Sequence, residues 1–349
     1  MPKNFQINGR VIGPGHPTYI IAELSANHHH SLERAIKHME AAKAAGADAV
    51  KLQTYTADTM TIDCDAPPFQ IKGTQWDGRT LYDLYAEAHT PWDWHYRLKA
   101  VADDLGLDLF STPFDASAVD FLLELGVPAI KVASFELVDV PLLRRVARTG
   151  KPLIVSTGMS TLGEIEEAVG VIKAAGGEEL ALLKCTSAYP SPPEAMNLRT
   201  IPNMAEAFQV PVGLSDHSLE LAVPVAAVTL GACIIEKHFI LSRAEKGPDS
   251  AFSLEPGEFK AMVDAVRATE RALGSVSYGV DAKESENRVF RRSLFAVKAI
   301  KAGEAFTEEN VRSIRPGHGL HPRYFDDVTG RTASQDIERG TPLSWHLVR

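Results

Sequence analysis

Residues 107–114 read LDLFSTPF, residues 129–136 read AIKVASFE, and residues 152–159 read PLIVSTGM. Each segment is a short apolar run that ends in small polar or ionisable residues. Runs of this kind are typical of buried strands in a parallel sheet. The stretches between them are of mixed polarity and long enough for a helix. The three segments therefore predict a regular alternation of strand and helix.

The same alternation extends in both directions along the chain. Helical patterns cover residues 31–45, 161–175 and 258–273, and Thr161 with Glu164 has the spacing of a capping box. Eight alternating units predict closure into a (β/α)8 barrel. A doubly wound open sheet is the alternative, but no GxGxxG motif follows the first strand. The eight expected strands are residues 19–24, 48–53, 107–111, 129–133, 152–156, 180–185, 211–214 and 233–237.

Smaller elements are expected on both sides of the barrel. Residues 5–12 contain two short apolar runs around an Asn-Gly turn, which predicts a hairpin. We expect the barrel domain to span residues 1–280, a polar linker to span 281–290, and a small compact domain to span 291–349. A domain of about 60 residues buries a marginal core, so we expect it to dock on another surface.

Composition limits the classes of function. The chain has 349 residues, 45% hydrophobic residues and a net charge of −9. This charge argues against a general nucleic-acid binder. We read no signal peptide and no membrane span, so no membrane partner is expected. Three widely spaced cysteines fit a reducing cytoplasm.

One connection, residues 54–90, is far longer than an ordinary loop between a strand and the following helix. It contains Trp76, Tyr82, Tyr85 and His89. The segment is either a surface excursion or a wall of the substrate pocket, because such loops build the active face of a barrel.

Polar side chains fall at the carboxyl ends of all eight expected strands, where barrel enzymes keep their sites. A single polar residue at one strand end would mean little, but eight in register predict an active site. The residues are Glu23, Lys51, Gln53, Ser111, Thr112, Lys131, Ser134, Glu136, Ser156, Thr157, Thr186, Ser187, Tyr189, Ser215, Asp216, His217, Glu236 and His238.

Two chemical groupings stand out among them. His217 and His238 follow neighbouring strands, so their imidazoles could share one ion in an open Lewis-acid site, whereas a lone histidine would be read as structural. Lys51 and Lys131, with the nearby serines, resemble a cradle for phosphate and carboxylate. A Schiff-base lysine is the competing interpretation.

At these residues the chain resembles the sialic acid synthase family over essentially its whole length, and its tail resembles the antifreeze-like (SAF) domain of that family. The tail motifs are RRSLFA (291–296) and SIRPGHGLHP (313–322). The barrel motifs are IAELSANH (21–28), VKLQT (50–54), STPF (111–114), KVASFE (131–136), STGM (156–159), KCTSAYP (184–190), GLSDHS (213–218), IEKHF (235–239) and GPDSAFSL (247–254).

The resemblance implies substrates, a metal and a set of site residues. Phosphoenolpyruvate and an amino-sugar aldehyde would be the substrates, and Mn²⁺, or alternatively Mg²⁺ or Co²⁺, would be bound by His217 and His238. Phosphoenolpyruvate would be held by Lys51, Thr112, Lys131, Ser134, Ser156, Ser187 and Ser215. The sugar would contact Gln53, Glu136, Tyr189, Asp249 and Arg315. Catalytic roles would fall to Glu23 (the best general-base candidate), Glu136 and Lys131.

The resemblance also implies an assembly and a sugar class. The SAF domain would cap the partner subunit's barrel in a homodimer, with Arg315 reaching the sugar. LSANH (24–28), ASFE (133–136) and LYDLYAEAHTPWDWH (81–95) look like the branch of the family that makes pseudaminic acid rather than neuraminate or legionaminate. One departure is His30, which stands where the family commonly has glycine. We expect His28, His29 and His30 to decorate a loop.

The implied reaction joins C3 of phosphoenolpyruvate to the aldehyde, polarised by the ion. Water adds at C2 with general-base help, and phosphate leaves by C–O cleavage. Two rivals remain. A pyruvate-dependent aldolase would not need the phosphate cradle, and a non-catalytic carbohydrate-binding protein would not need the metal.

Overall fold

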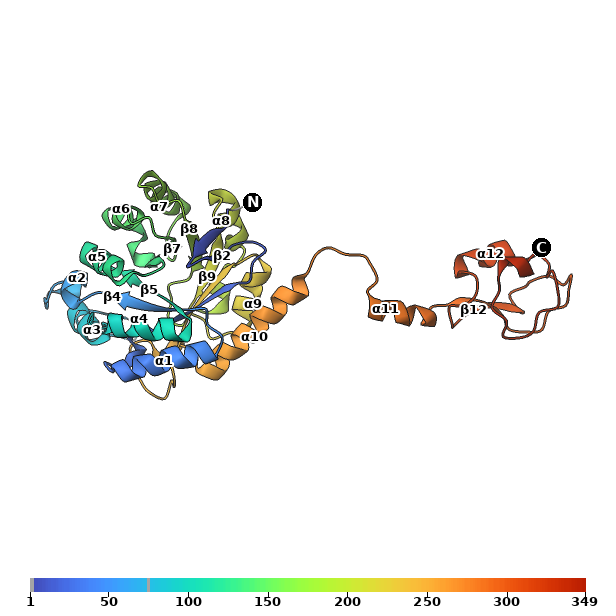
Figure 1. The fold of residues 1–349 in the computed structure, drawn as a ribbon, viewed down its shortest axis with the longest axis horizontal. Coiled ribbons are helices and arrows are strands. Elements are labelled where there is room, and N and C mark those ends of the chain that lie inside the picture. The colour runs from blue at the N-terminus through green and yellow to red at the C-terminus, as the bar shows by residue number, and fades with distance from the viewer. Residues whose placement is uncertain (1–2, 74–75) are drawn as a thin grey trace. The chain divides into compact units, whose positions relative to one another are not determined.

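The computed structural model describes residues 3–73 and 76–349. Eight parallel strands close into a barrel in the order β10-β3-β4-β5-β6-β7-β8-β9, which confirms the predicted (β/α)8 architecture (Figure 1). Closure is made by β10 and β3, which pair from Ile234 opposite Tyr19 to His238 opposite Glu23. The strands are β3 Tyr19–Glu23, β4 Ala49–Thr54, β5 Asp108–Pro113, β6 Ile130–Val132, β7 Leu153–Ser156, β8 Leu180–Cys185, β9 Val212–Asp216 and β10 Ile234–His238.

Helices surround the strands and cover their outer faces (Figure 1). Local sequence sets where they begin: the Ser31 hydroxyl accepts from the Arg34 N–H, and Thr161 and Glu164 form the predicted capping box. The helices of the barrel unit are α1 Leu32–Ala44, α2 Ala57–Met60, α3 Leu81–Ala88, α4 Trp94–Leu105, α5 Ala116–Leu125, α6 Val140–Ala147, α7 Leu162–Ala174, α8 Thr200–Phe208, α9 Ala222–Thr229 and α10 Pro256–Leu273.

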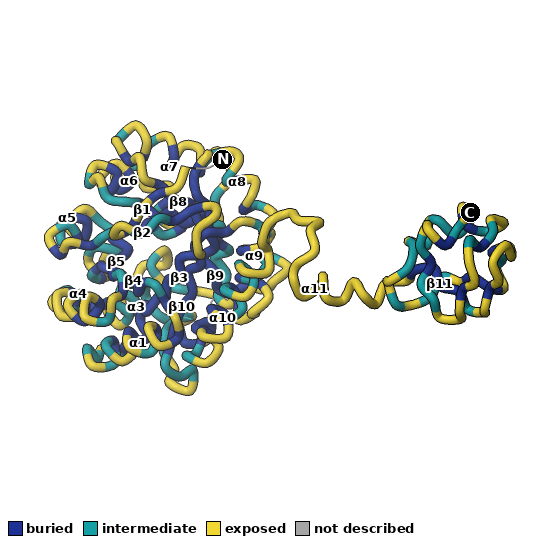
Figure 2. Tube along the Cα trace, turned by 45° about the vertical axis from the view of Figure 1, so that its right-hand side comes forward, coloured by how far each residue is buried: buried dark blue, intermediate teal, exposed yellow. Residues whose placement is uncertain are grey.

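The strands are buried and the outward helix faces are exposed (Figure 2), so the apolar core lies inside the barrel and between strands and helices. The predicted strands agree with the structure within a few residues. The differences of interest are at β9 and β10, which run to Asp216 and His238 and are therefore longer at their carboxyl ends than predicted.

A hairpin of β1 (Phe5–Ile7) and β2 (Arg10–Ile12) precedes the barrel, as predicted from the Asn8-Gly9 turn. Its polar residues bond to the amino-terminal ends of the strands. The Asn8 amide donates to Asp108 at 3.0 Å, and Arg10 forms an ion pair with Asp48. These contacts fix the hairpin at the end of the barrel opposite the site.

The chain divides into two compact units, residues 1–274 and 275–349. Residues 281–290, expected as a linker, contain α11 (Ala282–Asn287) and a short 3₁₀ helix, Arg288–Phe290. The second unit pairs β11 (Ser293–Ala296) with β12 (Val311–Ile314) in an antiparallel ribbon and includes α12 (Phe325–Val328). It has its own core, built on Leu294, Ile300, Phe306, Val311, Ile337 and Leu343.

Candidate active site

Lys51, on β4, is a buried ammonium that contacts residues of other barrel strands. Parallel strands bring their carboxyl ends to one face, and β3 and β4 pair with Glu23 opposite Lys51. The Lys51 ammonium lies 2.6 Å from a Glu23 carboxylate oxygen and donates to the Thr112 hydroxyl at 3.3 Å. All three side chains are buried. The structure thus brings together three predicted site residues from three strands.

Lys131, on β6, is the second buried ammonium of the site. It donates to the Ser156 hydroxyl at 2.6 Å and to the Val132 carbonyl at 2.8 Å. Burial lowers its pKa, against the opposing effect of Glu236. Lys131 and Ser156 are therefore hydrogen-bonded across neighbouring strands, and an anionic ligand bound there would favour the charged form of Lys131.

Two further predicted hydroxyls lie close to Gly158, which follows β7. The Gly158 N–H donates to the Ser134 hydroxyl at 3.0 Å. A Cβ at position 158 would lie 2.8 Å from the Ser134 oxygen and closer still to the Ser187 oxygen. Glycine is required there because the two serines occupy the space that a side chain would take. Ser134 and Ser187, far apart in sequence, thus form one hydroxyl pair.

Glu236 was among the polar residues expected at the strand ends, but the sequence assigned it no role. The Ser215 hydroxyl donates to its carboxylate at 3.3 Å, and Lys51 lies 3.7 Å away. Burial opposes its ionisation, but the charges of Lys131 and Lys51 outweigh burial and lower its pKa. Burial raises the pKa of Glu23. The signal was available: Glu236 precedes His238 by two residues, and alternate residues of a strand share a face.

Ser25, which was absent from the residues expected at the site, bonds to the sugar-binding candidates Gln53 and Asp249. The Gln53 amide donates to Glu23 and to the Ser25 hydroxyl, each at 3.1 Å. The Ser25 hydroxyl in turn donates to Asp249, which also accepts from the Ala26 N–H at 3.2 Å. Burial raises the pKa of Asp249. Ser25 lies in the LSANH motif, but no spacing rule would have linked it to Asp249.

The two predicted metal-binding histidines face each other. Their ring centroids are 5.3 Å apart. The His217 Nδ1 lies 3.0 Å from the Thr186 carbonyl oxygen, which fixes the tautomer and leaves Nε2 free to coordinate. His238 Nδ1 is buried without a partner, and burial holds the His238 pKa well below 6.5. A neutral His238 imidazole with an unpaired buried nitrogen fits a divalent cation.

This pair would supply two protein ligands. In the part of the chain that the structure describes, no group of three or more His, Cys, Asp or Glu is arranged to hold a metal ion. A cation at His217 and His238 would complete its shell with water or substrate. Such an open shell suits a Lewis-acid site and does not suit a closed structural one.

Aromatic rings line the site beside the histidines. The Tyr189 ring lies 4.4 Å from that of His217 and 5.0 Å from that of Phe252. Trp76, from the long 54–90 connection, lies 6.4 Å from Tyr189 and donates from its indole nitrogen to the Pro248 carbonyl at 3.3 Å. The long connection therefore reaches the site, which favours the pocket-wall interpretation over a surface excursion.

Glu136 stands apart from the central carboxylates, in the 3₁₀ helix Ser134–Val138. One of its carboxylate oxygens is buried without a hydrogen-bond partner. Burial raises its pKa to about 7, although Lys131 opposes the shift. A carboxyl with a pKa near neutrality is suited to proton transfer.

The expectation that His28–His30 merely decorate a loop was wrong for His28. Its ring is buried, lies 3.0 Å from the Thr90 hydroxyl through Nε2, and packs 5.5 Å from Trp94. His30 does tolerate the turn, with a φ of 51°, and bonds to the Glu87 carbonyl. These histidines connect the first loop to the end of the 54–90 connection.

Arg315, the remaining sugar-binding candidate, belongs to the second unit, where it directly follows β12. The other candidates named above all belong to the barrel unit.

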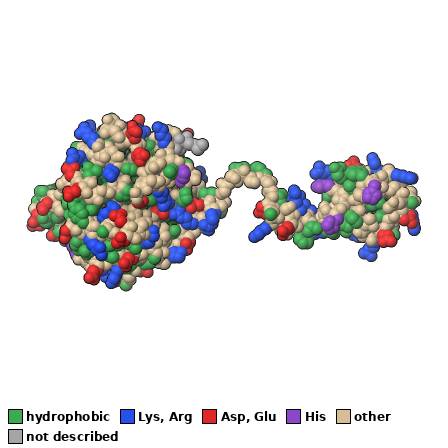
Figure 3. Space-filling view, viewed as in Figure 1, with side chains coloured by type: hydrophobic (Ala, Val, Ile, Leu, Met, Phe, Trp, Pro, Cys, Tyr) green, Lys and Arg blue, Asp and Glu red, His purple; other side chains and the backbone are tan. Residues whose placement is uncertain are grey.

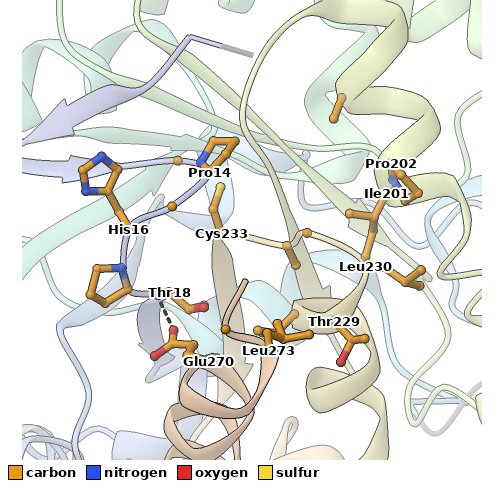
Figure 4. Close-up of a pocket in the computed structure, with 18 of the residues that line it drawn as sticks. Pro14, His16, Thr18, Ile201, Pro202, Thr229, Leu230, Cys233, Glu270 and Leu273 are labelled. Carbon is orange, nitrogen blue, oxygen red and sulfur yellow. Dashed lines mark hydrogen bonds between the residues drawn. The ribbon is translucent and has the colours of Figure 1, made fainter. Parts of the chain in front are cut away.

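A groove of about 960 Å³ opens at the opposite, amino-terminal end of the barrel (Figure 4). Pro14, His16, Ile201 and Leu230 line it, and Glu270 accepts from the Thr18 N–H at 2.6 Å. The strand-end carboxylates, lysines and imidazoles are absent from its lining. This face of a barrel serves stability, so we place the chemistry at the carboxyl ends.

The surface offers basic and acidic side chains together. Figure 3 shows Lys and Arg interspersed with Asp and Glu over the visible face of the barrel. Across the described residues, none of the helices has the length and apolar character needed to span a bilayer.

A closed (β/α)8 barrel with buried lysines, serine hydroxyls and paired imidazoles at the carboxyl ends of its strands defines a barrel enzyme for small anionic substrates. The chain matches the NeuB family over residues 38–278 and the SAF domain over residues 291–349. It is 50% identical to the pseudaminic acid synthase of Campylobacter jejuni, covering 93% of this chain and 95% of that one.

More distant relatives cover the chain equally well. The N,N'-diacetyllegionaminic acid synthase of Legionella pneumophila is 37% identical over 100% of this chain and 99% of its own length. The crystal structure of the spore coat polysaccharide biosynthesis protein spsE of Bacillus subtilis aligns with a TM-score of 0.69 and 36% identity, covering 99% of both chains. The chain belongs to the NeuB family.

Proposed function

We propose that this protein condenses phosphoenolpyruvate, 2,4-diacetamido-2,4,6-trideoxy-L-altrose and water to pseudaminic acid and inorganic phosphate. The observation that carries the proposal is the anion cradle of Lys51, Lys131 and the hydroxyls around Gly158, built next to two facing imidazoles. The choice of sugar rests on similarity: identity is 50% to the Campylobacter jejuni pseudaminic acid synthase and 37% to the legionaminic acid synthase.

In this proposal the lysines and hydroxyls bind both charged ends of phosphoenolpyruvate. Lys51 and Lys131 supply charge, and the small hydroxyls supply short donors that fix orientation. The residues that would hold this substrate are Lys51, Thr112, Lys131, Ser134, Ser156, Ser187 and Ser215.

The sugar would lie toward Gln53, Tyr189 and Asp249. The hydrogen bonds that join Gln53 to Ser25 and Ser25 to Asp249, and the packing of Tyr189 against His217, support this arrangement. C3 of phosphoenolpyruvate forms a bond to the aldehyde carbon, water adds to C2, and the C2–O bond to phosphate breaks. Glu23 is the proposed general base for water, and Glu136 the second proton-transfer group. General-base help of this kind contributes roughly 10²–10⁴ in rate.

We propose that His217 and His238 hold a divalent cation, Mn²⁺ in preference to Mg²⁺ or Co²⁺. A cation bound there would polarise the aldehyde oxygen as a Lewis acid. The unpaired His238 Nδ1 supports this proposal.

We further propose a homodimer in which the second unit caps the partner subunit's barrel and Arg315 reaches the sugar. The small size of the second core supports docking on another surface. The guanidinium of arginine stays charged and suits a hydroxylated or anionic group. We assign the activity to the cytoplasm, where thiols such as Cys64, Cys185 and Cys233 stay reduced.

Product analysis tests the proposal directly. The protein is incubated with phosphoenolpyruvate carrying ¹⁸O at the bridging oxygen and with one of three sugars: the 2,4-diacetamido altrose sugar, its legionaminate counterpart, or N-acetylmannosamine. We expect the first sugar to give the highest kcat/KM, with the label in phosphate. Label retained at C2 would exclude C–O cleavage. Equal kcat/KM values would exclude the pseudaminate assignment, and turnover with pyruvate in place of phosphoenolpyruvate would favour the aldolase.

A further inference from the structure

A buried ion pair lies behind the two histidines. The Lys237 ammonium is 2.6 Å from the Asp216 carboxylate, and their side chains are 1% and 0% exposed. The two residues are direct neighbours on β10 and β9. Because Glu236 and His238 point into the barrel, strand alternation turns Lys237 outward, toward the helices. The pair therefore contacts neither substrate nor metal position.

The Lys237–Asp216 pair bonds to both ends of the turn 216–218, which has His217 at its middle. The Ser218 N–H donates to one Asp216 carboxylate oxygen at 2.8 Å, and Lys237 bonds to the other oxygen and to the Ser218 carbonyl. One ammonium thus holds both ends of a three-residue turn.

Lys237 is also the residue next to His238. Its side chain consequently ties the backbone beneath one imidazole to the backbone beneath the other. On the β8 side, His217 is held by Thr186 through its ring and by the Ser191 N–H at 3.0 Å through its carbonyl. The Lys237 contact supplies the constraint from the β10 side.

Stability alone does not account for this pair. Replacing a buried ion pair by apolar residues of similar volume is often neutral or stabilising, because desolvation offsets the attraction between the charges. A pair placed between the two histidine-bearing strand ends can instead fix their spacing.

We propose that Lys237 and Asp216 are positioning residues that set the separation and orientation of His217 and His238, and through them the affinity for the cation. This inference rests on the metal site proposed above. Residues behind metal ligands orient them, and their loss typically weakens metal binding about 10–100-fold.

Mn²⁺ alone, titrated into metal-stripped full-length protein and followed by the free Mn²⁺ signal in electron paramagnetic resonance, tests the proposal. The key variant is the double replacement Lys237→Met with Asp216→Asn, which leaves no buried charge unpaired. We expect it to keep the wild-type melting temperature and bind Mn²⁺ roughly 10–100-fold more weakly. Lys237→Leu with Asp216→Asn, which likewise leaves no buried charge unpaired, gives the same readout if the first double variant does not fold.

Arg10→Met is the matched control, because it breaks the Arg10–Asp48 pair at the other end of the barrel. It should lower the melting temperature and leave Mn²⁺ affinity unchanged. Wild-type Mn²⁺ affinity in the folded double variant would overturn the positioning role while the metal site stands. A wild-type protein that binds no Mn²⁺ would overturn the metal site itself, and the inference with it.

Discussion

Replacing Gly158 by alanine tests the phosphoenolpyruvate cradle with a single methyl group. The added Cβ would lie 2.8 Å from the Ser134 oxygen and closer to the Ser187 oxygen, distances at which real Cβ atoms are essentially never found. The backbone at Gly158 is not left-handed, so alanine adds no backbone strain there and acts only through its Cβ. Both hydroxyls must move to admit the methyl group.

The magnitude follows from what the two hydroxyls are proposed to do. A hydrogen bond to a charged group contributes about 1.5–3 kcal/mol, so displacing two costs about 3–6 kcal/mol, or roughly 10²–10⁴-fold in kcat/KM for phosphoenolpyruvate. The KM for the sugar should change much less, because Gln53 lies on β4 and Asp249 in the loop after β10, whereas Gly158 follows β7.

Steady-state kinetics with each substrate varied in turn measures the effect. Gly163→Ala is the control, because a Cβ there meets no atom within 4 Å. Its position inside α7 favours alanine over glycine by about 1 kcal/mol, so its melting temperature should not fall. A Gly158→Ala enzyme with kcat/KM for phosphoenolpyruvate near the wild-type value would refute the cradle.

Three further predictions concern protons, metal and assembly. We expect Glu136 to act as a base, in its carboxylate form. Burial raises its pKa to about 7, so the carboxylate fraction and kcat/KM should rise together as pH rises through 7. A Glu136→Gln variant that keeps this rise in kcat/KM would contradict the base role. EDTA should abolish turnover, and added Mn²⁺ should restore it. His217→Ala and His238→Ala should fold and remain inactive with or without Mn²⁺. Full activity of the metal-stripped enzyme would contradict the Lewis-acid role. Arg315→Ala and His238→Ala should each be nearly inactive alone. Unfolded and refolded together, they should recover about a quarter of wild-type activity, because about half the dimers are mixed and each mixed dimer has one working site. A mixture as inactive as the two variants alone would mean that the second unit caps the barrel of its own chain.

Much of the fold could be read from the sequence because strand and helix patterns are local. The strand at 180–185 was predicted to the residue, and Ser31, Thr161 and Glu164 marked helix starts by hydrogen bonds that span three residues. The identity of the residues at the strand ends followed as well, since a parallel barrel sends every carboxyl end to one face.

The partners of those residues were beyond local patterns. Glu236 was visible as a polar strand residue, yet its role depended on lying 3.7 Å from Lys51, a residue on β4. Likewise, His28 looked like loop decoration until Thr90 and Trp94 were found against it. Burial changes the chemistry of such groups, and burial is a property of neighbours that are distant in sequence.

The sequence by itself therefore determined the number of βα units, their order and the face that carries the polar side chains, because each depends on residues a few positions apart. Only the tertiary structure decided that His238 of β10 lies opposite Glu23 of β3, that Gly158 leaves room for Ser134 and Ser187, and that Lys237 bonds to the turn at His217. Those arrangements depend on ångström-scale distances between strands far apart in the chain, and such distances are fixed only when the barrel closes and its side chains pack together.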